Sequence, residues 1–230
     1  VLVGHSYGGE FALHAALEAQ DRLRGLVLID SAGLPREREE FLPEEIAMRE
    51  HPLAKFGIWL HDEERVRGAL VPHFANAPRD EFATEAFLAC ARSSTWDAMV
   101  ELARDENGTR ASELPRVHIP VLLLWGERDL AYPPSKFASR FAADLPDAKL
   151  VVLDGVGHYP IEEARDRVAA ELVAFEFERE CEVCYADDML PRVLADLRAD
   201  RVVALSDFYM GAPLMQRLLS LRAPDVKLND

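Results

Sequence analysis

The stretch Val1-Leu2-Val3-Gly4-His5-Ser6-Tyr7-Gly8-Gly9 opens the chain, and the fold is inferred from it. Its three leading apolar residues are typical of a buried parallel strand. The pattern Gly-x-Ser-x-Gly follows, and an apolar run then predicts a helix from Tyr7 to about Ala19. A tight strand-to-helix turn leaves no room for side chains on both flanks of the serine, which favours glycine there. We expect Ser6 to be a nucleophile, with the Tyr7 N–H as an oxyanion donor; the alternative is a glycine-rich turn with a bystander serine.

Two later apolar runs end in residues that could activate a serine. Val121–Trp125 is followed by Gly126-Glu127-Arg128-Asp129, and Leu150–Leu153 leads to Gly157-His158. The chain order is therefore serine, acid, histidine. The first gap leaves room for a strand and a helical insertion, and the second fits one helix and one strand.

Over about residues 1–178 these motifs resemble those of serine-dependent α/β-hydrolases with a helical cap. The resemblance implies an α/β fold with a mostly parallel sheet flanked by helices. It also implies a triad of Ser6, His158 and Asp129 that works through an acyl-enzyme. Serine at position 6 argues against epoxide hydrolase or haloalkane dehalogenase chemistry, which use aspartate there in this fold.

Two neighbouring residues offer competing interpretations. Asp30 ends the predicted strand Leu26–Ile29, where some relatives hold the triad acid. We rank it second to Asp129, because Asp129 lies in the loop typical of the family, and a turn residue at a strand end is the simpler reading of Asp30. His5 is interpreted as structural, because neighbouring strand residues point in opposite directions.

Between Ser31 and about Leu114 the strand pattern stops and prolines separate short helical segments. This predicts a helical cap over residues 35–114, with a hydrolase core formed by 1–34 and 115–178. Caps in this family roof the site, so apolar cap residues are candidates for the substrate pocket, although packing between cap helices is the alternative for each. These candidates are Trp59, Phe74, Trp96 and Met99. The cap histidines lack metal-ligand spacing and are read as surface or core residues: His51, His61 and His73.

A long acidic helix is predicted over about Ile161–Glu178, with these apolar residues facing inward: Val168, Leu172, Val173 and Phe175. In the family that the chain resembles this helix normally closes the domain, so residues 179–230 extend beyond it. Cys181-x-x-Cys184 has no second cysteine pair nearby, so we expect no metal there. Arg201–Tyr209 reads as a strand containing Ser206, followed by a helix at Pro213–Leu221. This pattern weakly resembles the second motif of haloacid-dehalogenase-like hydrolases. That family's Asp-x-Asp nucleophile motif is not present upstream, so we expect an accessory βα segment or a domain fragment rather than an active phosphatase.

Composition narrows the possible partners. The 230 residues are 49% hydrophobic, enough for one core, and carry a net charge of −15, which argues against nucleic acid or an anionic membrane. No apolar run reaches membrane-spanning length. Three cysteines are too few for a disulfide framework, so we expect a cytoplasmic protein. We expect no cofactor and no metal, and a small-molecule acyl substrate.

The chain also departs from the resemblance at its start. The family takes its second oxyanion donor from a loop after an earlier strand, and this chain begins beyond that loop. We therefore expect N-terminal truncation, self-association through the edge at Val1–Val3, and little activity of this chain by itself. A small carboxylic ester is the expected substrate, with amides, lactones and C–C bonds beside a ketone as related options. Acyl transfer on the same triad and a non-catalytic interaction module remain open alternatives.

Overall fold

The structure is a computed structural model that describes residues 1–230 except 61, 92, 106–107, 185–210, 223 and 225–230. The side chains of 58–60 and 93 also lie outside the description. The chain forms two compact units, 1–169 and 170–230. The expected division into core, cap and tail stays a prediction, because the first unit contains both the expected cap and most of the expected core.

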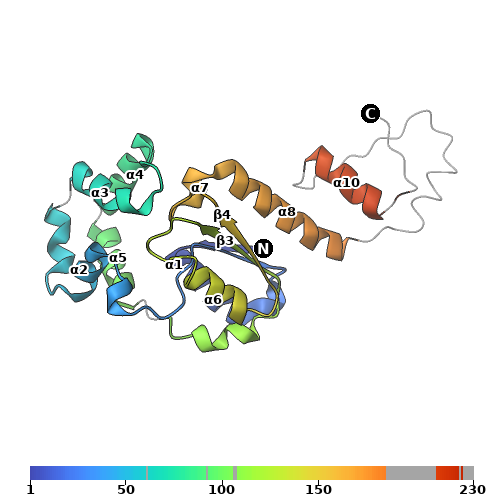
Figure 1. The fold of residues 1–230 in the computed structure, drawn as a ribbon, viewed down its shortest axis with the longest axis horizontal. Coiled ribbons are helices and arrows are strands. Elements are labelled where there is room, and N and C mark those ends of the chain that lie inside the picture. Colours follow the sequence, from blue (N-terminus) through green and yellow to red (C-terminus); the bar gives the residue numbers. More distant parts are fainter. Residues whose placement is uncertain (61, 92, 106–107, 185–210, 223, 225–230) are drawn as a thin grey trace. The chain divides into compact units, whose positions relative to one another are not determined.

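Four parallel strands form the sheet, in the order β1-β2-β3-β4 (Figure 1). Their bounds are β1 (Leu2–His5), β2 (Leu26–Ile29), β3 (Val121–Gly126) and β4 (Ala148–Leu153). β2 and β3 are buried along their whole length, because each has a strand on both sides and helices over the sheet. The carboxyl ends of parallel strands meet at one edge, so the loops that follow these four strands lie close together. This confirms the expected α/β fold. The expectation that the opening strand is buried is wrong, because β1 lies at an edge of the described sheet and Val3 is 49% exposed.

Helices α1 (Tyr7–Ala19) and α6 (Phe137–Asp144) pack on the sheet and close the core. The cluster at the centre joins Leu13 of α1, Leu28 and Leu123 of the sheet, and Phe141 of α6, all of them fully buried. Short 3-10 turns follow α1 and precede β3: η1 (Gln20–Arg22) and η5 (Ala111–Arg116).

The segment between β2 and β3 is helical, and we call residues 35–114 the helical insertion. It contains α2 (Pro43–Glu50), α3 (Glu63–Leu70), α4 (Asp80–Cys90) and α5 (Ser93–Asp105), with 3-10 turns η2 (Arg38–Glu40), η3 (Ala54–Leu60) and η4 (Val71–His73). Ala54, Trp96 and Val100 form a small core of its own.

The expectation of one helix from Ile161 to Glu178 is wrong. The chain forms α7 (Pro160–Glu163), leaves helical geometry at Ala164 with φ −139°, and then forms α8 (Arg165–Val183). Val173 was expected to face inward, yet 46% of it is exposed. Val168 and Phe175 are buried as expected.

In the second unit, α10 (Ala212–Arg222) contributes Leu218, which packs with Phe177 of α8. The strand and serine expected at Arg201–Tyr209, and with them the comparison with haloacid-dehalogenase-like hydrolases, fall outside the described residues. Within the described part of the chain, every helix is too short or too polar to cross a membrane.

Candidate active site

Ser6 alone makes the turn between β1 and α1. Its backbone lies at φ 53° and ψ −125°, a conformation that a residue other than glycine adopts only at a cost of about 1–3 kcal/mol. Such strain is maintained where the surrounding structure fixes the residue, and it is concentrated at functional sites. Tyr7 is the first residue of α1, and the N–H groups of the first helical turn are left for partners outside the helix.

The glycines around this turn meet the sequence expectation only in part. A Cβ on Gly4 would lie 2.3 Å from the Gly8 carbonyl oxygen, so glycine is required there. A Cβ on Gly8 would meet nothing within 4 Å, so the requirement expected at this flank is wrong. The second crowded position is Gly9, where a Cβ would lie 2.0 Å from the Ser31 Oγ.

A chain of two hydrogen bonds joins the three residues proposed from the motifs. His158 Nε2 lies 3.0 Å from Ser6 Oγ, and His158 Nδ1 lies 3.0 Å from Asp129 Oδ2. Asp129 Oδ1 accepts from the N–H groups of Ala131 at 2.8 Å and Tyr132 at 3.1 Å. Asp129 and His158 are both buried, so this geometry is held by packing as well as by hydrogen bonds.

The surroundings of Asp129 favour its ionised form. Burial opposes ionisation, but the charge of His158, its hydrogen bond and the Tyr132 N–H outweigh burial and hold the pKa of Asp129 below its ordinary value. An ionised acid beside Nδ1 places the proton on that nitrogen and leaves Nε2 as an acceptor. The arrangement can therefore take a proton from a serine hydroxyl and stabilise the imidazolium that results.

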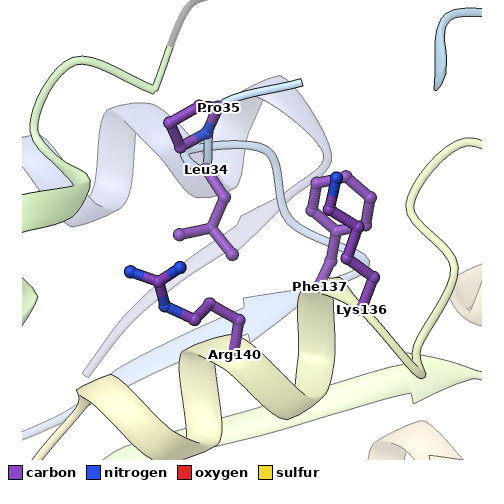
Figure 2. A pocket seen from close by; sticks show the side chains of 5 residues that line it. All are labelled: Leu34, Pro35, Lys136, Phe137 and Arg140. Carbon is purple, nitrogen blue, oxygen red and sulfur yellow. The ribbon is translucent and has the colours of Figure 1, made fainter. Parts of the chain in front are cut away.

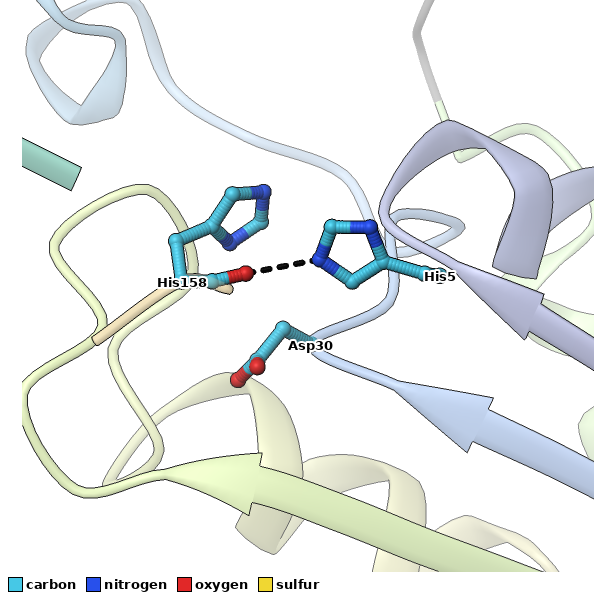
Figure 3. Close-up of side chains that lie close together, drawn as sticks. All are labelled: His5, Asp30 and His158. Carbon is cyan, nitrogen blue, oxygen red and sulfur yellow. Dashed lines mark hydrogen bonds between the residues drawn. The ribbon is translucent and has the colours of Figure 1, made fainter. Parts of the chain in front are cut away.

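His5 supports the histidine loop from the neighbouring strand. Its Nε2–H donates to the backbone carbonyl of His158 at 2.6 Å (Figure 3). Burial and then the charge of His158 lower the pKa of His5 to about 4, so its ring is neutral at neutral pH. This placement is consistent with a structural role for His5. Of the two candidate acids, Asp129 is the one that bonds His158 Nδ1, while Asp30 Oδ1 accepts the Gly126 N–H at 2.8 Å.

His5, Asp30 and His158 also offer ligand atoms that lie within 4.8 Å of one another (Figure 3). Histidine and aspartate are common metal ligands. Both ring nitrogens of His158, however, already bond Ser6 and Asp129, and His5 Nε2 already bonds a carbonyl. A cation at this position would displace the hydrogen bonds of the site, so we do not assign a metal to it.

An aromatic wall lies beside the histidine. Tyr159 stacks on Phe74 with ring centroids 4.7 Å apart, and Phe82 approaches Tyr159 edge-on at 5.3 Å. The Tyr159 ring lies 5.3 Å from that of His158. The expected pocket residue Phe74 thus reaches the site, together with Phe82 and Tyr159, which sequence reasoning missed. The position of Tyr159 directly after the histidine was the available signal.

The other candidates of the helical insertion have surroundings of three different kinds. Trp96 is buried and its Nε1–H donates to the Ala54 carbonyl at 2.9 Å, so it packs the interior of the insertion. Met99 is half-buried with its sulfur 3.7 Å from that of Cys90. The Trp59 side chain is outside the described residues.

His73 was interpreted as a surface or core histidine. In the structure its carbonyl accepts the His158 N–H at 2.7 Å, and its ring lies 5.8 Å from that of His158.

Glu163 connects the helical insertion to the histidine loop. Its Oε1 accepts the Gly157 N–H at 2.9 Å, one residue before His158. Its Oε2 accepts the N–H groups of Ala75 at 2.8 Å and Asn76 at 3.4 Å. The carboxylate of Glu163 therefore binds the backbone of the helical insertion and the backbone of the histidine loop at the same time. No spacing in the sequence indicated this contact.

A separate pocket of about 300 Å³ opens between the segment after β2 and helix α6 (Figure 2). Its lining residues are Leu34, Pro35, Lys136, Phe137 and Arg140. Ser6, Asp129 and His158 are not among them. Its two cations already pair with acids, Lys136 with Glu40 and Arg140 with Asp144, so the pocket offers an anionic ligand little unopposed charge.

Comparison with known proteins adds independent information. Residues 1–171 match the model of the alpha/beta hydrolase family. The uncharacterized hydrolase YugF of Bacillus subtilis is 29% identical over 188 residues, 76% of this chain and 64% of that protein. Haloalkane dehalogenase 2 of Mycobacterium tuberculosis is 25% identical over 74% of this chain and 62% of its own length. The crystal structure of a membrane phospholipase A described as a bacterial virulence factor superposes with a TM-score of 0.62, at 27% identity over 78% of this chain and 57% of that one. The chain thus spans less than two thirds of the length of these proteins.

Proposed function

Since the chain belongs to the alpha/beta hydrolase family, we propose that it is a serine hydrolase with Ser6 as nucleophile, His158 as general base and Asp129 as the acid that orients it. The observation that supports this proposal most directly is the pair of 3.0 Å hydrogen bonds from Ser6 through His158 to Asp129. The strained backbone of Ser6 at the end of the parallel strand β1 supports the same assignment.

The proposed reaction proceeds in two halves. The Ser6 Oγ attacks the substrate carbonyl carbon while its proton passes to His158 Nε2, and the oxyanion forms beside the Tyr7 N–H at the start of α1. His158 then gives the proton to the leaving oxygen, the C–O bond breaks, and an acyl-enzyme remains. Water then attacks the acyl carbon as His158 takes its proton. The bond from this carbon to Ser6 Oγ breaks, and His158 returns the proton to Ser6 as the acid product leaves.

We propose a small carboxylic ester as the substrate. Phe74, Phe82 and Tyr159 form an apolar wall beside His158, which suits a hydrocarbon portion of an acyl or alcohol group. Serine at position 6 argues against the carbon–halogen chemistry named for the mycobacterial relative, because that chemistry uses an aspartate nucleophile in this fold.

Labelling with a fluorophosphonate tests the proposal directly. The reagent should attach to Ser6 and abolish hydrolysis of p-nitrophenyl acetate. Ser6→Ala should abolish labelling, whereas Ser139→Ala, which removes an exposed hydroxyl from α6, should leave labelling unchanged. Labelling that survives in Ser6→Ala would refute the assignment. No labelling of the wild-type chain would favour the non-catalytic alternative, and added alcohols would reveal acyl transfer through a second product.

A further inference from the structure

Asp30 is a buried carboxyl group next to the proposed triad that the mechanism does not use. It follows β2 with a positive φ of 41°, and it is fully buried. Its N–H donates to the Leu124 carbonyl at 3.0 Å, and its Oδ1 accepts the Gly126 N–H at 2.8 Å. Both contacts are with β3, so the carboxyl group is fixed over the end of the strand that leads to Asp129.

The second oxygen of Asp30 has an unusual environment. Oδ2 is buried, and within the described part of the chain no group donates a hydrogen bond to it. The titratable groups that act on Asp30 or lie against it are His5 from β1, His158 and Glu163 from the segment after β4, and Asp129. His5 is neutral at neutral pH, as derived above, and the two acids are of like charge. An ionised Asp30 would therefore be buried beside a second carboxylate without a cation of its own, which is costly.

We propose that Asp30 is a positioning residue that keeps its proton and donates it in a hydrogen bond to the carboxylate of Asp129. An ionised carboxylate only accepts, so two carboxyl groups bond each other only when one retains a proton. Asp129 already accepts from Ala131, Tyr132 and His158, which makes Asp129 the ionised partner. Asp30 has an oxygen that no donor reaches, which makes it the protonated one.

The electrostatics of the pair agree with this assignment. Burial and then the charge of Asp129 raise the pKa of Asp30 well above its ordinary value, and a hydrogen bond between the two side chains acts in the same direction. The same hydrogen bond helps to lower the pKa of Asp129. Neighbouring acids whose pKa values are pushed apart have different roles, and here one is ionised while the other is a donor.

The consequence for catalysis rests on the proposed triad. Asp129 is held by backbone N–H groups on one side and by Asp30 on another, so its oxygen stays aligned with His158 Nδ1. The bond also keeps Asp129 ionised as His158 takes up and releases its proton. The proton of Asp30 itself is not transferred at any step.

Infrared spectroscopy of the whole chain tests the protonation state without reference to activity. At neutral pH the wild type should show the carbonyl stretch of a protonated carboxylic acid. Asp30→Asn should remove that band, and Asp154→Asn, at an exposed aspartate, should leave it. Asparagine tolerates positive φ, accepts from Gly126 and donates to Asp129, so this variant should fold. If Asp30→Asn does not fold, Asp30→Ser provides the same test, because it also removes the carboxylic acid band. Absence of the band in wild type, or its persistence in both variants, would overturn the proposal.

Kinetics test the positioning role. Asp30→Asn should retain a kcat close to wild type and an unmoved acid limb, because charge and donor are both preserved. Asp30→Leu removes the donor and should lower kcat by about ten- to a hundredfold, the range for partners that orient a site, with little change in KM. If Asp30 were ionised, Asp30→Asn would instead shift the acid limb to lower pH, because the imidazolium would lose a nearby negative charge. Hydrolysis that survives in Ser6→Ala would refute the proposed triad while leaving the infrared result valid.

Discussion

At the scale of single residues, Asp129 determines which nitrogen of His158 carries the proton. Asp129→Asn should lower kcat by several powers of ten, on the order of 10⁴, because an amide can donate to Nδ1 and stabilise the wrong tautomer. Steady-state kinetics and circular dichroism together separate this loss from unfolding. Asp30→Asn is the matched control, since it makes the same substitution at another buried aspartate at the same edge of the sheet. If Asp30→Asn lost more activity than Asp129→Asn, the triad acid would be Asp30.

The lowered pKa of His5 predicts a stability change with pH. Folding lowers this pKa from 6.5 to about 4, so as pH falls the unfolded chain binds the proton first. The contribution of His5 is therefore complete above about pH 6.5 and is lost between pH 6.5 and 4, by up to about 3 kcal/mol. His5→Gln keeps a donor for the His158 carbonyl but does not titrate. Urea unfolding across this range should show a shallower decline in the variant, and equal slopes would contradict the prediction.

At the scale of secondary-structure elements, Glu163 holds the helical insertion against the histidine loop. Glu163→Gln leaves one oxygen for two sites that both need an acceptor, at Gly157 and Ala75. We expect a loss of about 1–3 kcal/mol in unfolding free energy, and a lower kcat because the His158 loop loses a support.

Glu162→Gln is the matched control for that experiment. Glu162 pairs with Arg79 and Arg165, whose side chains are about half exposed. Exposed pairs of this kind contribute about 0–1 kcal/mol. Equal effects of the two substitutions on stability and kcat would mean that Glu163 has no special role at the site.

These elements also show what could be predicted from the sequence. β2 and α1 match expectation because Leu26–Ile29 is a short apolar run and Tyr7–Ala19 follows a glycine turn. The break at Ala164 could not be predicted, because alanine is a good helix former. Val173 is exposed for a different reason: it lies five residues after Val168 on α8, which at 3.6 residues per turn places it away from the side that Val168 and Phe175 share.

The candidate site, too, has a part that could be predicted from the sequence and a part that could not. The proximity of Ser6, Asp129 and His158 was predictable, because each follows a parallel strand and those strand ends share one edge. The partners of Glu163 and the stacking of Phe74 on Tyr159 depend on how the helical insertion folds back, and no local pattern encodes that contact. The crowding at Gly9 likewise comes from Ser31, which is remote in sequence.

At the scale of the whole molecule, the exposed edge of the sheet favours self-association, whereas the net charge disfavours it. In the described sheet β1 pairs with β2 and forms one edge. Val1 and Val3 are 42% and 49% exposed there, and an apolar exposed edge is a template for pairing with a second chain. The net charge of −15 repels such a chain, but salt screens that repulsion within about 10 Å at 0.1 M. Self-association through β1 should therefore increase with salt.

Val3→Lys tests this edge contact. A lysine on an edge strand disfavours strand pairing, while the exposed position of Val3 allows the substitution without disturbing the core. We expect sedimentation equilibrium of the 230-residue chain at increasing salt to show dimers or larger species in wild type and mostly monomer in Val3→Lys. Leu88→Lys makes a similar change on α4, at a side chain that is 59% exposed, and should associate like wild type. A wild-type chain that stays monomeric at every salt concentration would contradict the prediction. If Leu88→Lys abolished association as well, the effect would come from added positive charge rather than from the strand edge.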